Sequence, residues 1–163
     1  MKYLYEMTTE LNMTYLDKVT FMNHVKNFAK ENLGLTSDNT PYMLNLGMAS
    51  LGKAVSYTMD DGSEMMGFIS INEEQELYEM INTILHETKH LEQCIKQSLF
   101  YRVSFKAHNI LKKHNLWNRL TYNLAFHEID ARFYAWRTMR KFNKELNALI
   151  EKAYNNELDQ LFY

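Results

Sequence analysis

One segment of the sequence has the residue types and the spacing of a metal-binding motif: His86-Glu87-Thr88-Lys89-His90. On a helix, residues four apart lie one turn above each other, so both imidazoles can reach one ion. The intervening Glu87 then points toward a water molecule bound to that ion. This spacing predicts a zinc site in which His86 and His90 are ligands. A pair of ordinary surface histidines is the alternative interpretation.

The helix that carries this motif has an apolar stripe on another of its faces. At about 100° per residue, His90 lies near His86, whereas the apolar side chains lie well around the helix from both. The histidines are therefore predicted to face a cleft or solvent, and the stripe is predicted to face the core. The apolar residues of the stripe are Leu77, Met80, Ile84, Leu91 and Ile95.

A third ligand must come from elsewhere, because a catalytic zinc ion takes three protein ligands and leaves one position for water. The best candidate is Glu128, a lone carboxylate in a helix stripe that is otherwise apolar. Burying an unpaired carboxylate costs several kcal/mol, so Glu128 needs a cation, a proton or a strong hydrogen-bonding partner. A salt bridge to Arg102 or Arg119 is the alternative, and His127 could replace Glu128 as a ligand. The other residues of the stripe are Trp117, Leu124, Ala131, Ala135 and Phe142.

The elements that must position these residues follow from the distribution of helix breakers. All five glycines and the one proline precede residue 68, so the C-terminal half is predicted to be helical. We predict helices over 14–33 with Gly34 as the cap, from the acidic segment 73–76 to about 99, and over about 116–142 and 143–160. Strands are predicted over 42–46, 54–59 and 65–71. Asp60-Asp61-Gly62-Ser63 joins the last two in a hairpin, because an Asp-Gly step supplies the positive φ of a tight turn.

These elements predict an α+β fold in a single domain over residues 1–163. It has an N-terminal helix, a small three-stranded sheet with a hairpin, and a helical C-terminal half that carries the motif and Glu128.

Composition and charge exclude several classes of function. The 163 residues are 46% hydrophobic and carry a net charge of −2, which disfavours a disordered chain and wholesale polyanion binding. Lys112-Lys113-His114 beside Trp117 is too short a basic cluster to predict nucleic-acid binding. No run of about 18 apolar residues could span a membrane, and residues 1–7 lack the apolar core of a secretory signal. Because Cys94 is also the only cysteine, we expect a cytoplasmic protein.

Charge is distributed unevenly along the chain. Residues 1–79 carry 5 basic and 12 acidic side chains, net −7, whereas residues 80–144 carry 12 and 4, net +8. The basic part could steer an acidic protein segment toward the motif. Alternatively, the two parts could neutralise each other within one chain or in a dimer.

Together, these features resemble the zincin metallopeptidases, and within them the gluzincin type, in which Glu is the third ligand. The compact size is similar to that of the minigluzincins and of the ImmA/IrrE-like peptidases of phages and mobile elements. The resemblance covers about residues 14–142, and Glu128-Ile129-Asp130-Ala131 is similar to the Glu-x-[Glu/Asp]-Ala pattern of many third-ligand helices. The chain departs from several of these families at Arg132, where they have an Asp that orients a ligand His. Asp130 is a candidate to replace it.

The resemblance implies a zinc-dependent endopeptidase that hydrolyses peptide bonds in an intracellular protein or peptide target. It implies that His86, His90 and Glu128 hold Zn²⁺ and that Glu87 is the general base. It also suggests two candidates for transition-state stabilisation, His127 and Tyr134. By the same analogy, an extended substrate would add to an edge strand formed by Gly67, Phe68, Ile69 and Ser70.

Two other classes of function fit parts of this pattern. A binding protein could keep the zincin-like fold without catalysis, for example as a phage or mobile-element inhibitor of a host protein. A di-metal helical bundle also uses the Glu-x-x-His spacing of Glu87 and His90. That architecture requires a second such pair, and the sequence contains none.

Overall fold

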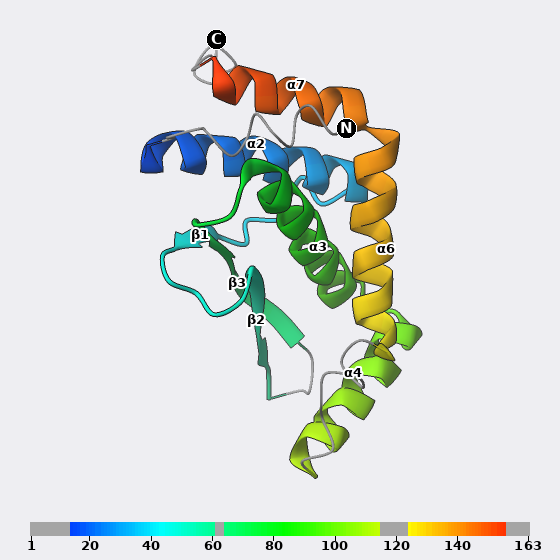
Figure 1. Cartoon of the computed structure of the whole chain (residues 1–163). Helices are drawn as coiled ribbons and strands as arrows, with labels where there is room; N and C mark the ends of the chain where they lie inside the picture. The colour runs from blue at the N-terminus through cyan, green and yellow to red at the C-terminus, as the bar shows by residue number, and fades with distance from the viewer. Residues whose placement is uncertain (1–13, 61–63, 115–123, 156–163) are drawn as a thin grey trace.

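The structure is a computed structural model of the chain, and it describes residues 14–60, 64–114 and 124–155. These residues form five helices and a three-stranded sheet, which confirms the α+β class (Figure 1). In chain order the elements are α2 (Tyr15–Leu33), β1 (Tyr42–Asn45), β2 (Gly52–Thr58), β3 (Glu64–Asn72), α3 (Leu77–Lys96), α4 (Leu99–Lys113), α6 (Phe126–Lys141) and α7 (Asn143–Tyr154).

The first helix, α2, has the predicted boundaries because both of its ends are capped. The Thr14 side chain accepts a hydrogen bond from the Asp17 backbone N–H, and the Asp17 side chain accepts one from the Thr14 backbone in return. At the other end, Gly34 adopts the left-handed conformation with a φ of 70°.

The sheet has the strand order β1-β3-β2, with β1 parallel and β2 antiparallel to β3. The antiparallel pairing of the predicted hairpin is therefore confirmed, while Asp61, Gly62 and Ser63 lie outside the described residues. The prediction of an edge strand at Gly67, Phe68, Ile69 and Ser70 is wrong. These residues belong to the central strand, where Ile69 lies opposite Tyr42 on one side and Ala54 on the other.

β3 is central because the parallel strand β1 pairs with the edge of β3 that β2 leaves open. The sequence pattern did not specify the pairing partner of β1. β1 and β2 together pair with both edges of β3, and the side chains of Ile69 and Ile71 are fully buried in the core. The outer strand on the other side of β3 is β2.

The helices of the C-terminal half have different boundaries from those predicted. The motif helix ends at Lys96, because Gln97 adopts a left-handed conformation with a φ of 40°. The separate helix α4 that follows was not predicted. The helix predicted from about residue 116 begins at Phe126 in the described residues, and Trp117 and Arg119 lie outside them.

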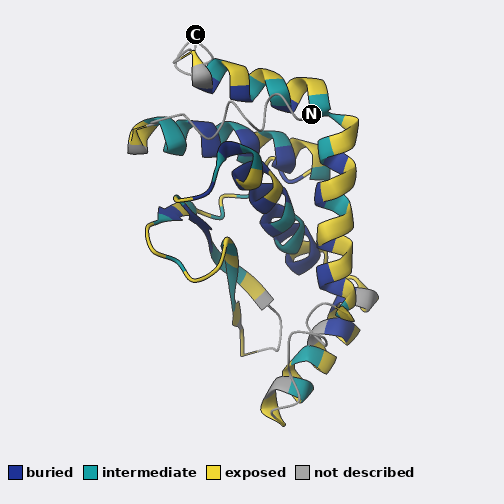
Figure 2. Cartoon of the chain, viewed as in Figure 1, coloured by how far each residue is buried: buried dark blue, intermediate teal, exposed yellow. Residues whose placement is uncertain are grey.

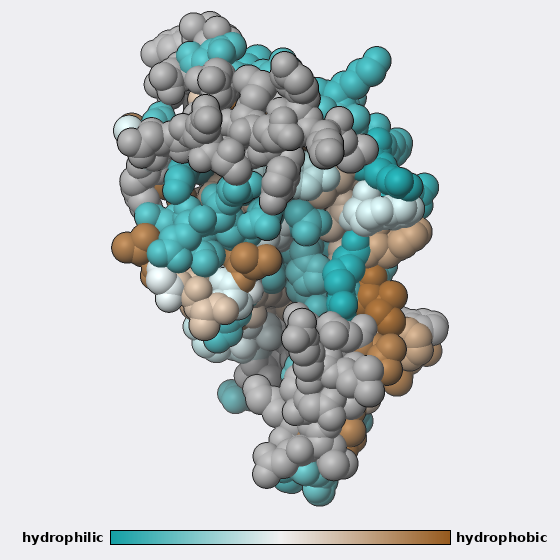
Figure 3. Space-filling model, in the orientation of Figure 1, coloured by the Kyte–Doolittle hydropathy of each residue, from teal (hydrophilic) through white to brown (hydrophobic). Residues whose placement is uncertain are grey.

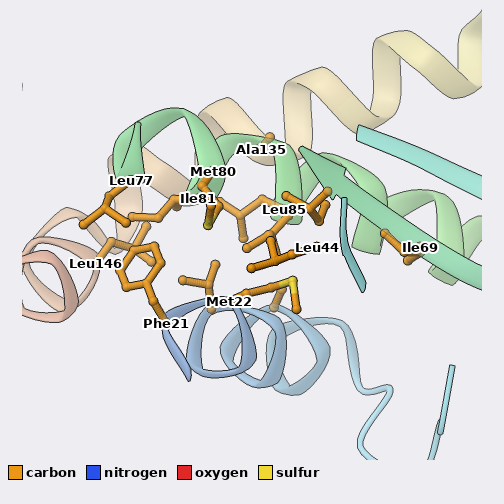
Figure 4. Close-up of a cluster of buried hydrophobic side chains, with 14 of the residues drawn as sticks. Phe21, Met22, Leu44, Ile69, Leu77, Met80, Ile81, Leu85, Ala135 and Leu146 are labelled. Carbon is orange, nitrogen blue, oxygen red and sulfur yellow. The ribbon is translucent and has the colours of Figure 1, made fainter. Parts of the chain in front are cut away.

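The core lies where α3 packs against the sheet, α2 and α6 (Figures 1 and 4). Figure 2 shows that most of α3 is buried. The predicted α3 stripe is buried except for Ile95, which is 48% exposed. Leu124 is also exposed and does not belong to the α6 stripe. Cys94 is buried, as expected for a small apolar side chain.

Among the described helices, none combines the length and the apolar character needed to cross a membrane.

Candidate metal centre

The packing of α3 against α6 brings together the three side chains predicted as ligands: His86, His90 and Glu128. Ala131 and Ala135 are buried on α6, and their small side chains allow the two helices to approach closely. The histidines follow one another on α3 by one helical turn, and Glu128 lies in the first turn of α6. One potential ligand atom of each residue lies within 4.8 Å of the other two.

The separations of the side chains allow one ion to contact all three, with a different Glu128 oxygen facing each imidazole. The two Nε2 atoms of His86 and His90 are 3.1 Å apart. One Glu128 oxygen lies 3.4 Å from His86 Nε2, and the other lies 3.5 Å from His90 Nε2. Bonds of about 2.0–2.1 Å at tetrahedral angles would place two ligand atoms roughly 3.3 Å apart. Two imidazoles and a carboxylate are also a donor set that zinc accepts, and they leave a fourth position open.

The Glu128 carboxylate is 7% exposed and lies against imidazoles. Besides the two predicted ligands, His127 Nε2 approaches it at 3.8 Å. Burial alone would lower the pKa of His90, but hydrogen bonding to Glu128 and the nearby Glu87 charge raise it above its ordinary value. The carboxylate therefore attracts positive charge to this place, from a proton or from a metal ion.

Glu87 is buried beside the ligands and is held by strand β2. Its carboxylate accepts a backbone hydrogen bond from Ala54. Burial raises the pKa of Glu87, and the adjacent His90 and His86 counteract part of that effect. The close approach of β2 depends on Gly52, where a Cβ atom would lie 3.0 Å from Glu87 Oε1.

Gln93, which the sequence analysis did not identify, bonds to Asp130 and orients His90. The Gln93 amide nitrogen donates to the backbone oxygen of His127 at 3.0 Å and to Asp130 Oδ2 at 2.9 Å. The amide oxygen of Gln93 then faces His90 Nδ1 at 2.9 Å, so that Nδ1 donates and Nε2 keeps its lone pair for a metal.

Gln93 and Asp130 together take the place of the Asp that several zincin families have at the position of Arg132. The Arg132 side chain donates to the Glu128 backbone oxygen at 3.1 Å. Asp130 contacts Gln93 and not a ligand histidine, so it supports His90 indirectly. The available sequence signal was the position of Gln93, three residues after His90 on the same helix.

A cavity of about 350 Å³ opens beside Glu87, His90 and Glu128. Helix α4 borders the cavity and contributes Tyr101 and His108 to its lining. The sequence analysis singled out neither residue, because it did not predict α4. The remaining described residues of the cavity lining are Gly52, Lys53, Ala54 and Ser56 from β2, Met66 from β3, Glu87 and His90 from α3, and His127 and Glu128 from α6.

Of the two candidates for transition-state stabilisation, His127 lies at the cavity and Tyr134 is not among its described lining residues. His127 lines the cavity, with its Nδ1 2.7 Å from Ser104 Oγ on α4 and its ring centroid 5.7 Å from that of His108. Burial lowers the pKa of His127 to about 4, so the imidazole is neutral near pH 7. Tyr134 does not line the described part of the cavity; its ring lies 5.7 Å from Lys89 Nζ. Burial raises the pKa of Tyr134 to about 12.

A scan against models of known protein families, a search of curated proteins and a search of solved structures each found no match for this chain.

Proposed function

We propose that this protein is a zinc-dependent peptidase of the zincin type. The observation that carries the proposal is the meeting of His86, His90 and Glu128, with one potential ligand atom of each within 4.8 Å of the others. Glu87 lines the same cavity as His90 and Glu128. Three ligands with an open fourth position are typical of catalytic zinc sites, whereas structural sites are closed by four protein ligands.

The three ligands would hold Zn²⁺, which supplies an acidified water molecule and polarises the scissile carbonyl when it is bound. Glu87 would accept a proton from that water and pass it to the leaving amine. The raised pKa of Glu87 suits this role, because a group whose pKa lies closer to neutrality both takes up and releases a proton readily. The hydrogen bond from Ala54 keeps the carboxylate in place.

The substrate strand is assigned to β2 in place of β3. Four residues of β2, from Gly52 to Ser56, line the cavity, and β2 is the outer strand of the sheet on that side. An extended peptide that added to this edge would pass beside the ligands, and its backbone would bond to β2. The neutral His127 remains a candidate hydrogen-bond partner for the substrate carbonyl.

Zinc content and peptide cleavage, measured together, test this proposal. The purified chain is loaded with zinc, analysed by elemental mass spectrometry and incubated with a mixed peptide library. We expect one zinc per chain and cleavage in the wild type. The Glu87→Gln variant should keep its zinc and lose cleavage by about 10²-fold or more, the lower range for a general base.

The exposed Glu79 on the same helix provides a matched control, because Glu79→Gln changes the same charge away from the cavity. Cleavage that survives Glu87→Gln would refute the assignment of the base. A chain that binds zinc but cleaves no peptide would favour the alternative, a metal-holding protein that acts by docking on a partner. That alternative is supported by the exposed aromatic residues of α6, Phe133 and Trp136.

A further inference from the structure

The outer face of α6 carries a continuous row of large apolar side chains in contact with solvent. The row, called here the α6 surface, consists of Phe126, Ile129, Phe133 and Trp136, each at least 44% exposed. Their spacing places all four on one side of the helix, over about 15 Å of its length. Figure 3 shows apolar atoms gathered along the side of the molecule where α6 runs. Contiguous apolar patches on the surfaces of soluble proteins often mark binding sites.

The α6 surface leads into a second cavity, of about 450 Å³. Three of its four residues line this cavity, together with Tyr101 and Gln93. The volume lies within the range of about 300–1,000 Å³ that is typical of ligand pockets. A flat lipid surface cannot fill such a hollow, but side chains that project from a peptide can.

The border of the α6 surface is basic. Arg132, Arg137 and Arg140 are exposed on the same helix. The guanidinium of Arg140 lies 4.6 Å from the centre of the Trp136 ring. Asp130, the acidic side chain at this border, lies 3.4 Å from Lys89 and is partly neutralised by it.

From these observations we propose that the α6 surface binds an amphipathic protein helix whose apolar face is flanked by acidic residues. The apolar face would cover the row from Phe126 to Trp136 and place a side chain in the cavity, and its acidic residues would pair with the arginines. A second copy of this chain fits less well, because the same face turned upon itself would bring arginines together. The proposal does not require that the protein be a peptidase.

Three fluorescein-labelled synthetic helical peptides test the proposal. They share one leucine- and phenylalanine-rich face, and their remaining positions carry glutamate, glutamine or lysine. Binding to the full chain is measured by fluorescence anisotropy at low and at high salt. We expect the glutamate peptide to bind at least about tenfold more tightly than the lysine peptide, with a preference that shrinks as salt screens the charges.

Two variants locate the binding. The double variant Phe133→Ser, Trp136→Ser should weaken binding of the glutamate peptide by about tenfold or more, as expected when central aromatic side chains are removed. The double variant Arg137→Glu, Arg140→Glu should reverse the preference toward the lysine peptide. All four positions are exposed, and circular dichroism and melting temperature check that the variants fold. The control is Leu46→Ser, which alters an exposed apolar residue outside α6 and should leave binding unchanged.

Several results would overturn the proposal. These are binding of none of the peptides, equal binding of all three, or binding that neither variant alters. Light scattering that detects a dimer, lost in the Phe133→Ser, Trp136→Ser variant, would assign the surface to a second copy. Co-sedimentation with anionic phosphatidylserine vesicles, without peptide binding, would assign it to a membrane surface.

Discussion

Replacing Gln93 with methionine tests whether the metal centre depends on the hydrogen bonds that hold His90. Methionine keeps the length of the side chain but offers no oxygen to His90 Nδ1 and no donor to Asp130. Loss of an outer partner of a ligand histidine typically lowers metal affinity by about 10–100-fold. That range corresponds to about 1.4–2.7 kcal/mol of binding free energy.

The same substitution also affects folding. The backbone oxygen of His127 loses the amide donor of Gln93 within a buried region. A buried polar group that loses its partner costs about 1–3 kcal/mol, so the free energy of unfolding of the metal-free chain should fall within that range. The Gln93→Met variant should therefore bind zinc more weakly and also unfold more readily.

The Gln93→Glu variant separates these two effects. A glutamate keeps an acceptor for His90 Nδ1 but removes both amide donors and places a second carboxylate next to Asp130. We therefore expect zinc affinity closer to the wild type than in Gln93→Met, together with reduced stability. On the same helix, Ile95→Gln serves as a control, because Ile95 is half exposed and should affect neither quantity.

Competition with a chromophoric zinc chelator measures the affinity, and urea unfolding of the metal-free chain measures the stability. If Gln93→Met bound zinc as tightly as the wild type while remaining folded, His90 would not depend on Gln93, and the reasoning about its orientation would be wrong.

Three further predictions concern neighbouring residues. Gly52→Ala places a Cβ atom 2.5 Å from Thr83 Cγ2 and 3.0 Å from Glu87 Oε1, so we expect lost peptide cleavage and about 1–3 kcal/mol of destabilisation, measured by activity assay and urea unfolding. Zinc should raise the melting temperature more at pH 8 than at pH 6, because the raised pKa of His90 lets protons compete with the metal at the lower pH; an equal rise at both values would contradict this. Burial lowers the pKa of His127 to about 4 in the folded chain, whereas its ordinary pKa is about 6.5. Since the unfolded chain binds the extra proton, the stability of the metal-free wild type relative to His127→Asn should fall as pH drops from about 6.5 to about 4, and a flat difference across that range would count against it.

Much of the local structure could be predicted because it depends on neighbouring residues. The boundaries of α2 follow from Thr14 and Gly34, which satisfy backbone groups at its two ends. The pairing of β2 with β3 follows from alternating side chains on either side of a turn segment. The burial of Leu77 and Leu91 follows from helical periodicity.

The break between α3 and α4 could not be predicted in this way. Gln97 ends α3 in a left-handed conformation that glycine favours, although neither glycine nor proline is near. Because the sequence analysis did not predict α4, it also did not identify Tyr101 and His108, which line the cavity from that helix. Their positions depend on how α4 packs against α6, and this packing leaves no periodic signal of its own.

The sequence by itself determined that His86 and His90 share one face of a helix with Glu87 between them, because residues four apart on a helix are adjacent whatever surrounds them. It also identified Glu128 as a carboxylate that needed a cation or a hydrogen-bonding partner. Only the tertiary structure decided that this carboxylate lies 3.4 Å from His86 and that β2, not β3, is the outer strand beside the cavity. Distances between separate elements, and the choice of strand neighbours, result from the packing of the whole core, to which many residues each contribute a little.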